Sequence, residues 1–114
     1  MDQSVRLRIG DMRDYAAKAV EMLDGRDAHG LRADDMRFLA IVHAVQIVGE
    51  AARKVPDEVR LRAPSIAWRA SIAMRNILVH GYGDVDVDVL VDTVRNDFPP
   101  LIADLESLLG ETDI

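Results

Sequence analysis

The sequence predicts an all-α protein: an antiparallel bundle of four main helices with a fifth, short one. Hydrophobic residues make up 49% of the chain but aromatic residues only 4%. The core must therefore consist of Ala, Val, Ile, Leu and Met, a mixture that favours packed helices over a β-sandwich. Apolar residues also recur at steps of three and four along most of the chain. At 114 residues the chain has the size of one domain, so residues 1–114 are expected to form a single helical domain.

The first helix is expected over residues 3 to 24, with one apolar stripe along it. That stripe consists of Val5, Ile9, Met12, Ala16, Ala19 and Leu23. The polar connection that follows, residues 25 to 33, contains two glycines and is long enough to be mobile.

The second helix is expected from Asp34, a good N-cap, to about Val55, before Pro56. Its predicted core stripe consists of Met36, Leu39, Ala40, His43, Ile47 and Ala51. Three further valines (Val42, Val45 and Val48) widen the apolar surface beyond one face. A helix that is apolar on several sides packs on several sides, and a second copy of the chain is one candidate for the extra partner.

The rest of the chain predicts one short helix and two long ones. Residues 57 to 62 form the short one, and a helix over residues 65 to 79 follows, with Ser65 as its N-cap. The last helix is expected over residues 86 to 109, with a kink or break at Pro99-Pro100. Leu90, Val94, Leu101, Leu105 and Leu108 repeat along it at helical intervals. The alternating Asp-Val run over residues 84 to 89 has the period of a strand, but without a partner strand it is better explained as the acidic start of this helix.

The composition of the chain excludes several kinds of functional site. The net charge of the chain is −6. Cysteine is absent, so thiolate metal sites and disulfides are excluded. The Asp-rich run lacks the Gly and Glu that a calcium loop requires, and the three histidines have no zinc-binding spacing. No metal or other cofactor is therefore expected. No apolar stretch is long enough to span a membrane and no signal peptide is evident, so a cytoplasmic protein is expected.

The charge is uneven along the chain. Residues 53 to 80 carry six basic and two acidic residues, whereas nine acidic residues follow Gly83. The middle of the chain is therefore the part that could meet an anion, although ordinary solvated helix faces would produce the same distribution.

Four polar side chains fall close together near the predicted end of the third helix: Arg75, Asn76, His80 and Tyr82. Arginine supplies a planar cation suited to phosphate, and histidine exchanges a proton near neutral pH. Arg75 and His80 are five residues apart and lie about 140° apart around an ideal helix at roughly 100° per residue. They converge only if the helix unwinds at Gly81 or if two chains share one site. The alternative is that Arg75 and His80 have no catalytic role and only stabilise the C-terminal end of the helix, where positive charge interacts favourably with the helix dipole.

This arrangement resembles the R-x4-H-x-Y motif of the HepT-like toxins, a family within the HEPN superfamily of small helical ribonucleases. Ile47-Val48-Gly49-Glu50-Ala51 is similar to that family's I-x-G-E-A stretch. Pro64-Ser65-Ile66-Ala67-Trp68 resembles its Pro-x-Ile-Pro-Trp segment, with Ala67 in place of the second proline. Pro99-Pro100-Leu101 resembles its proline-leucine step. The resemblance covers roughly residues 5 to 109.

The resemblance implies a HEPN-like helical homodimer in which the motifs of both chains line one cleft and cut RNA without metal. Arg75 and His80 would be the catalytic pair, with Asn76 as an accessory residue. It also implies a cognate minimal nucleotidyltransferase antitoxin, as in type II or type VII toxin-antitoxin pairs. With ATP as donor, this partner would transfer AMP to Tyr82, whose flanking glycines should leave its ring accessible.

Two functions remain open at this stage. The first is a metal-independent endoribonuclease toxin, in which His80 serves as acid or base and Arg75 stabilises the phosphorane. The second is a non-catalytic module that holds a nucleotide or substrate beside a nucleotidyltransferase. The acidic net charge favours the second, and the complete motif favours the first.

Overall fold

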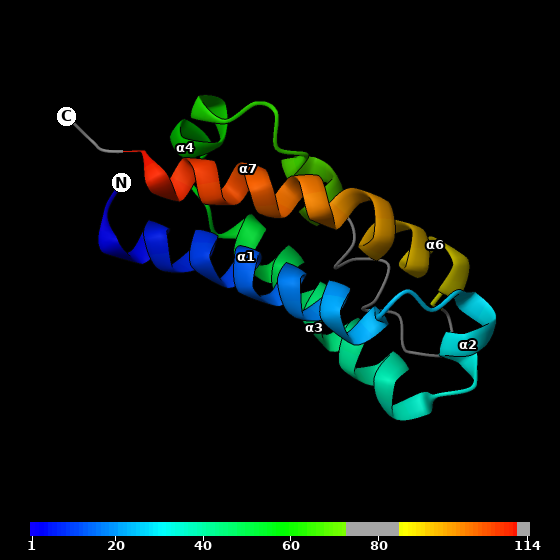
Figure 1. Cartoon of the computed structure of the whole chain (residues 1–114). Coiled ribbons are helices and arrows are strands. Elements are labelled where there is room, and N and C mark those ends of the chain that lie inside the picture. The colour runs from blue at the N-terminus through cyan, green and yellow to red at the C-terminus, as the bar shows by residue number, and fades with distance from the viewer. Residues whose placement is uncertain (73–84, 112–114) are drawn as a thin grey trace.

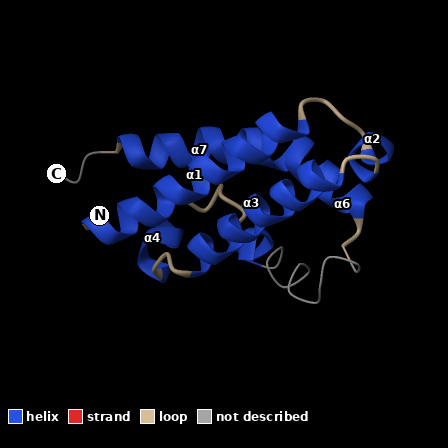
Figure 2. Cartoon of the chain, turned by 90° about the horizontal axis from the view of Figure 1, so that it is seen from below, coloured by secondary structure: helices blue, strands red, loops and turns tan. Residues whose placement is uncertain are grey.

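The computed structural model describes residues 1–72 and 85–111, and all regular secondary structure in these two stretches is helical (Figures 1 and 2). Three long helices, α1 (Gln3–Leu23), α3 (Asp35–Arg53) and α7 (Phe98–Gly110), form the body, and α1 packs against both of the others. The shorter elements are α2 (Ala28–Arg32), α4 (Asp57–Arg62), α6 (Val87–Asp92) and the π-helix η2 (Thr93–Asp97). The predicted all-α class is confirmed for these residues.

Helix α1 forms as the sequence predicts. The Asp2 carboxylate caps it by accepting a hydrogen bond from the backbone N–H of Val5 at 3.0 Å. This bond holds the pKa of Asp2 below its ordinary value. The six buried residues of α1 are the predicted stripe, and four of them are fully buried: Ile9, Met12, Ala16 and Ala19. Burying each of the larger side chains stabilises the fold by about 1.5–3 kcal/mol.

The connection after α1 contains a helix that the sequence pattern does not predict. Asp27 caps α2 by accepting a hydrogen bond from the N–H of Gly30 at 2.8 Å, and Leu31 is fully buried. The expectation of a connection without regular structure is therefore wrong for Ala28–Arg32. A helix of five residues is too short to show a periodic apolar pattern, so its capping aspartate and single buried leucine were its only signals.

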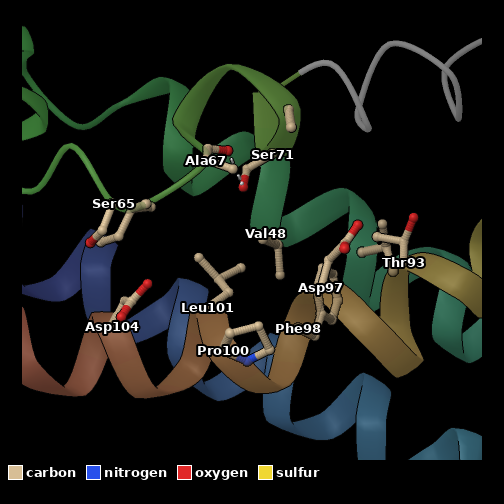
Figure 3. A pocket seen from close by; sticks show the side chains of 13 residues that line it. Val48, Ser65, Ala67, Ser71, Thr93, Asp97, Phe98, Pro100, Leu101 and Asp104 are labelled. Atoms are coloured by element: carbon tan, nitrogen blue, oxygen red, sulfur yellow. Dashed lines mark hydrogen bonds between the residues drawn. The ribbon is translucent and has the colours of Figure 1, made fainter.

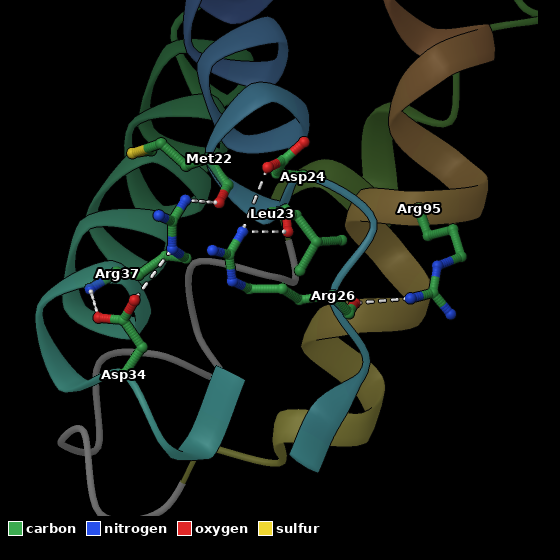
Figure 4. A network of polar contacts seen from close by, with 7 residues as sticks. All are labelled: Met22, Leu23, Asp24, Arg26, Asp34, Arg37 and Arg95. Atoms are coloured by element: carbon green, nitrogen blue, oxygen red, sulfur yellow. Dashed lines mark hydrogen bonds and ion pairs between the residues drawn. The ribbon is translucent and has the colours of Figure 1, made fainter. Parts of the chain in front are cut away.

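Arginine side chains fasten this connection to the helices around it (Figure 4). Arg37 of α3 donates one hydrogen bond to the Met22 carbonyl at the end of α1 and another to the Asp34 carboxylate at 3.1 Å. Arg95 of η2 donates to the Arg26 carbonyl at 2.6 Å. Arg37 thus ties the start of α3 to the end of α1, and Arg95 ties the connection to η2.

Helix α3 presents a different face to the core from the one predicted. Its buried residues are Ile41, Val42, Ala44, Val45, Val48, Gly49, Ala51 and Ala52. Of the predicted stripe, Ala51 alone is buried, while Met36 is 85% exposed, Leu39 is 45% exposed and His43 is also exposed. The interpretation of His43 as a core histidine is therefore wrong. The exposed side of α3 also carries Gln46, Glu50 and Arg53, so the predicted stripe followed the few apolar residues of an otherwise polar face.

The region after α3 confirms one boundary and corrects another. Helix α4 spans the predicted residues 57 to 62. The next helix begins at Trp68, whereas Ser65 lies in a turn and is not an N-cap. Its first turn is closed by the N–H of Ser71, which donates to the Ala67 carbonyl at 3.0 Å. The described part of this helix ends at Ile72.

The C-terminal helix runs through the proline pair with a π-helical turn before it. Asp86 caps α6 by accepting from the N–H of Val89 at 3.2 Å, so the Asp-Val run starts a helix as expected. In η2 the N–H of Phe98 donates to the carbonyl of Thr93, five residues earlier. Pro99 and Pro100 have no N–H and cannot continue the α-helical ladder, which explains why the irregular turn precedes them. The predicted leucine and valine stripe of this region is buried throughout.

The start of α1 and the end of α7 lie at the same end of the bundle (Figure 1). Arg6 of α1 donates a hydrogen bond to the carbonyl of Leu109 at 3.0 Å, and Arg62 of α4 pairs with Glu111 at 3.3 Å. Among the described helices, none is both long enough and apolar enough to cross a membrane.

Candidate functional site

The four motif residues, Arg75, Asn76, His80 and Tyr82, lie between 73 and 84 and so fall outside the described residues. Their proposed convergence therefore stays a prediction. The structure describes the chain on both sides of them. Ile72 and Val85, the described residues next to this segment, are both partly buried against the hydrophobic core.

The polypeptide that leads to the motif is held by Trp68. Its indole Nε1 donates to the carbonyl oxygen of Ala63 at 3.1 Å, and the side chain is 8% exposed. The Ser71 hydroxyl donates to the Ala67 carbonyl at 3.0 Å, and Ile66 is buried. These contacts determine where the helix begins and in which direction it leaves the body. The segment that resembles the Pro-x-Ile-Pro-Trp pattern thus has a structural role here.

The stretch of α3 that resembles I-x-G-E-A divides into buried and accessible residues. Val48, Gly49 and Ala51 are buried, whereas Glu50 is partly exposed. The Glu50 carboxylate pairs with Arg53, one turn later, at 3.9 Å. This stretch therefore combines packing residues with one accessible carboxylate.

Much of the positive charge in the middle of the chain is used within the protein. Arg60 donates to the carbonyls of Ala52 and Arg53 at 3.0 Å each and thereby satisfies the C-terminal end of α3. Arg60 also pairs with Asp57 at 3.5 Å, and Arg62 pairs with Glu111. Within the described residues, Lys54 and Arg69 are exposed basic side chains without an ion pair. The charge balance is thus not a direct measure of an anion-binding surface.

A cavity of about 220 Å³ lies between α3, the segment before the motif, and the η2–α7 region (Figure 3). It is lined by Val45, Val48, Ser65, Ile66, Ala67, Ala70, Ser71, Thr93, Asp97, Phe98, Pro100, Leu101 and Asp104. The sequence pattern does not predict this cavity. Its one local signal is the proline pair, because prolines interrupt the hydrogen bonds of a helix and favour an irregular turn before them. A π-helical turn of this kind often lies at a functional site.

Metal ligands do not cluster in the part of the chain that the structure describes. Over residues 1–72 and 85–111, no three His, Asp or Glu side chains are placed to hold a metal ion. His29 on α2 and His43 on α3 are both exposed.

The amino-acid sequence of the chain is similar to that of known proteins. Residues 12–108 match the family described as Ribonuclease HepT-like. A protein of Thermococcus cleftensis named "Probable ribonuclease HepT" is 41% identical over 75 residues, which cover 66% of this chain and 68% of that protein. A protein of Methanocaldococcus jannaschii named "Putative RNase MJ1380" is 27% identical over 104 residues, covering 91% of this chain and 95% of that protein. No solved structure matches the chain significantly.

Proposed function

The chain belongs to the HepT-like ribonuclease family, and from this premise we propose that it is a metal-independent endoribonuclease and the toxin of a toxin-antitoxin pair. The observation that carries the proposal is the family match over residues 12–108. This range contains the complete Arg75, Asn76, His80 and Tyr82 set. Relatives named as ribonucleases, at 41% and 27% identity, support an RNA substrate.

The proposed reaction is transesterification within the RNA strand. The ribose 2′-oxygen attacks the adjacent phosphorus while the bond to the 5′-oxygen of the next nucleotide breaks. His80 takes the 2′-hydroxyl proton or protonates the leaving 5′-oxygen, a role typically worth about 10²–10⁴-fold in rate. Arg75 stabilises the charge on the non-bridging oxygens, and Asn76 is an accessory polar group. The products are a 2′,3′-cyclic phosphate and a 5′-hydroxyl.

Cleavage of RNA in the presence of EDTA tests this function. The wild-type protein should cut RNA without a metal ion, and His80→Ala should reduce cleavage by at least about 10²-fold and remove growth inhibition on expression. His29→Ala is the matched control, because His29 is an exposed histidine of α2. If wild type leaves RNA intact and inhibits growth no more than His80→Ala does, the ribonuclease proposal is wrong.

The homodimer is part of the same proposal. Arg75 and His80 do not share a face of one ideal helix, so two copies that meet at one cleft would supply a complete site. The described surface offers an apolar area for such contact, since Met36 and Leu39 of α3 are 85% and 45% exposed. A twofold interface would bury these side chains in both copies.

Silencing by a cognate nucleotidyltransferase completes the proposal. The Tyr82 oxygen attacks the α-phosphorus of ATP, a P–O bond forms, pyrophosphate leaves, and the phenolic proton is released. The added phosphodiester charge would pair with Arg75 and occupy the place of the RNA phosphate. Intact-mass analysis after incubation with the partner and ATP should show a gain of one AMP.

A matched pair of variants locates the modification. Tyr82→Phe should lose the mass gain and keep most cleavage activity. Tyr15→Phe, which removes the chain's other tyrosine, should retain the gain. Modification of Tyr82→Phe to the same extent as wild type would contradict the mechanism.

A second candidate function is a non-catalytic nucleotide- or substrate-binding partner of a minimal nucleotidyltransferase. The net charge of −6 and the internal pairing of Arg60 and Arg62 favour it, because both reduce general attraction for RNA. A protein that binds its nucleotidyltransferase but neither cuts RNA nor inhibits growth would identify this function.

A further inference from the structure

The cavity between α3 and the η2–α7 region has an apolar floor with a carboxylate at each end (Figure 3). Val48 and Leu101 lie in its middle, Phe98 and Asp97 lie toward Thr93, and Asp104 lies on the side of Ser65. The two aspartates are seven residues apart, about two helical turns or roughly 10 Å along the axis. The cavity therefore has two negative charges separated by a hydrocarbon surface.

The polar groups of this cavity are mainly hydrogen-bond acceptors. The Thr93 hydroxyl donates its proton to the Val89 carbonyl at 2.8 Å, and the Ser71 hydroxyl donates to the Ala67 carbonyl at 3.0 Å. Both hydroxyls are left with lone pairs only. Asp97 and Asp104 have no hydrogen bond or ion pair with another described residue. A ligand that matches this lining must bring N–H donors and positive charge, and a phosphate would be repelled.

The size of the cavity limits the ligand to a short chain. An engineered apolar cavity of about 150 Å³ holds benzene, whereas drug-sized ligands occupy about 300–1,000 Å³. At about 220 Å³, this cavity suits a slender hydrocarbon. A stable protein–protein interface buries about 1,200–2,000 Å² of surface, far more than a hollow of this size provides. The dimensions thus favour a small molecule over a peptide.

We propose that this cavity binds an alkyl diammonium ligand, that is, a diamine or polyamine. Its methylene chain lies over Val48, Phe98 and Leu101, one ammonium group pairs with Asp97, and the other pairs with Asp104. Charge-assisted hydrogen bonds at both ends would orient the ligand along α7. This site does not depend on the proposed ribonuclease activity and is tested separately from it.

Titration of the whole protein with amines of different length tests the proposal by calorimetry and methyl NMR. Diaminooctane and spermidine should bind with shifts centred on the methyl groups of Val48, Ile66 and Leu101. Diaminobutane, too short to reach both carboxylates, and octylamine, with one ammonium, should each bind about tenfold more weakly. Asp97→Asn and Asp104→Asn should each lower the affinity for diaminooctane by about tenfold, the effect of losing one charge-assisted bond.

The control variant is Asp92→Asn, which removes an exposed aspartate of α6 outside the cavity and should leave diamine affinity unchanged. Equal affinity for octylamine and diaminooctane, an equal loss in Asp92→Asn, or no saturable binding would each overturn the proposal. So would a helical peptide with two lysines seven residues apart that bound more tightly than every diamine, since the site would then serve a protein partner.

Discussion

The indole nitrogen of Trp68 and the carbonyl oxygen of Ala63, five residues earlier, are 3.1 Å apart and close the turn from which the motif-bearing segment begins. Trp68→Phe keeps an aromatic ring but removes one of the two donors to this carbonyl, which also accepts a hydrogen bond from the Ile66 N–H at 3.1 Å. We expect the free energy of unfolding to fall by about 0.5–1.5 kcal/mol, the net contribution of one hydrogen bond. Urea denaturation followed by circular dichroism would measure it. A loss no larger than that of the exposed variant Arg69→Ala would show that the contact contributes nothing.

Truncation of a buried leucine of α7 should destabilise the protein strongly. Leu105 is fully buried, so Leu105→Ala should destabilise the protein by about 2–5 kcal/mol. Leu61 of α4 is 80% exposed, and Leu61→Ala should change stability by less than about 0.5 kcal/mol. Comparable losses in the two variants, measured by denaturant titration, would contradict the packing described here.

Arg60 predicts a difference between arginine and lysine at one position. Its guanidinium satisfies two carbonyls at the end of α3, so Arg60→Ala should cost about 1–3 kcal/mol. Arg60→Lys should recover only part of this loss, because an ammonium lacks the planar fork of the guanidinium.

The control for Arg60 is its ion-pair partner. Asp57 has a 93% exposed side chain, and Asp57→Asn should cost less than about 1 kcal/mol, as for exposed ion pairs in general. If Asp57→Asn proved as costly as Arg60→Ala, the ion pair and not the carbonyl contacts would account for the role of Arg60.

Acid should weaken the fold through the cap of α3. The backbone N–H of Arg37 and then its side chain lower the pKa of Asp34 below the ordinary value of 3.8. A depressed folded-state pKa means that the stabilisation is present above about pH 4 and is lost as pH falls through the folded pKa. Asp34→Asn should therefore show a shallower decline in melting temperature below about pH 4. A decline as steep as that of wild type would exclude this cap as a cause.

The exposed apolar residues of α3 test the proposed dimer. Leu39→Glu, and more so the double variant with Met36→Glu, should raise the dimer dissociation constant by at least about tenfold, since each apolar contact is worth about 1.5–3 kcal/mol. Leu7 of α1, which is 58% exposed, provides Leu7→Glu as the control. Light scattering at micromolar concentration would measure the change. Wild-type protein that is monomeric yet cleaves RNA would contradict the shared site.

Where one face of a helix is apolar and the other polar, the sequence by itself determined the structure. The stripe of α1 and the leucines of α7 are buried as periodicity predicts, because only one orientation of such a helix removes its apolar side chains from water. The cap Asp34 was equally predictable, since a carboxylate before a helix satisfies N–H groups in its own first turn. The motif residues are also known from the sequence alone, because they lie outside the residues that the structure describes.

Only the tertiary structure decided that α2 is a helix and that a cavity opens beside η2, whereas the polar residues of α3 already marked its exposed face. On α3, Val42 and Met36 are both apolar, yet Val42 is buried and Met36 is 85% exposed. Met36 shares its side of α3 with Gln46, Glu50 and Arg53, so the polar residues of that side indicate which face is exposed. The cavity requires Asp97 and Asp104 to line one space together with Ser65 and Ser71, which come from a distant part of the chain. Such contacts are set by how helices pack, a property that no single segment contains.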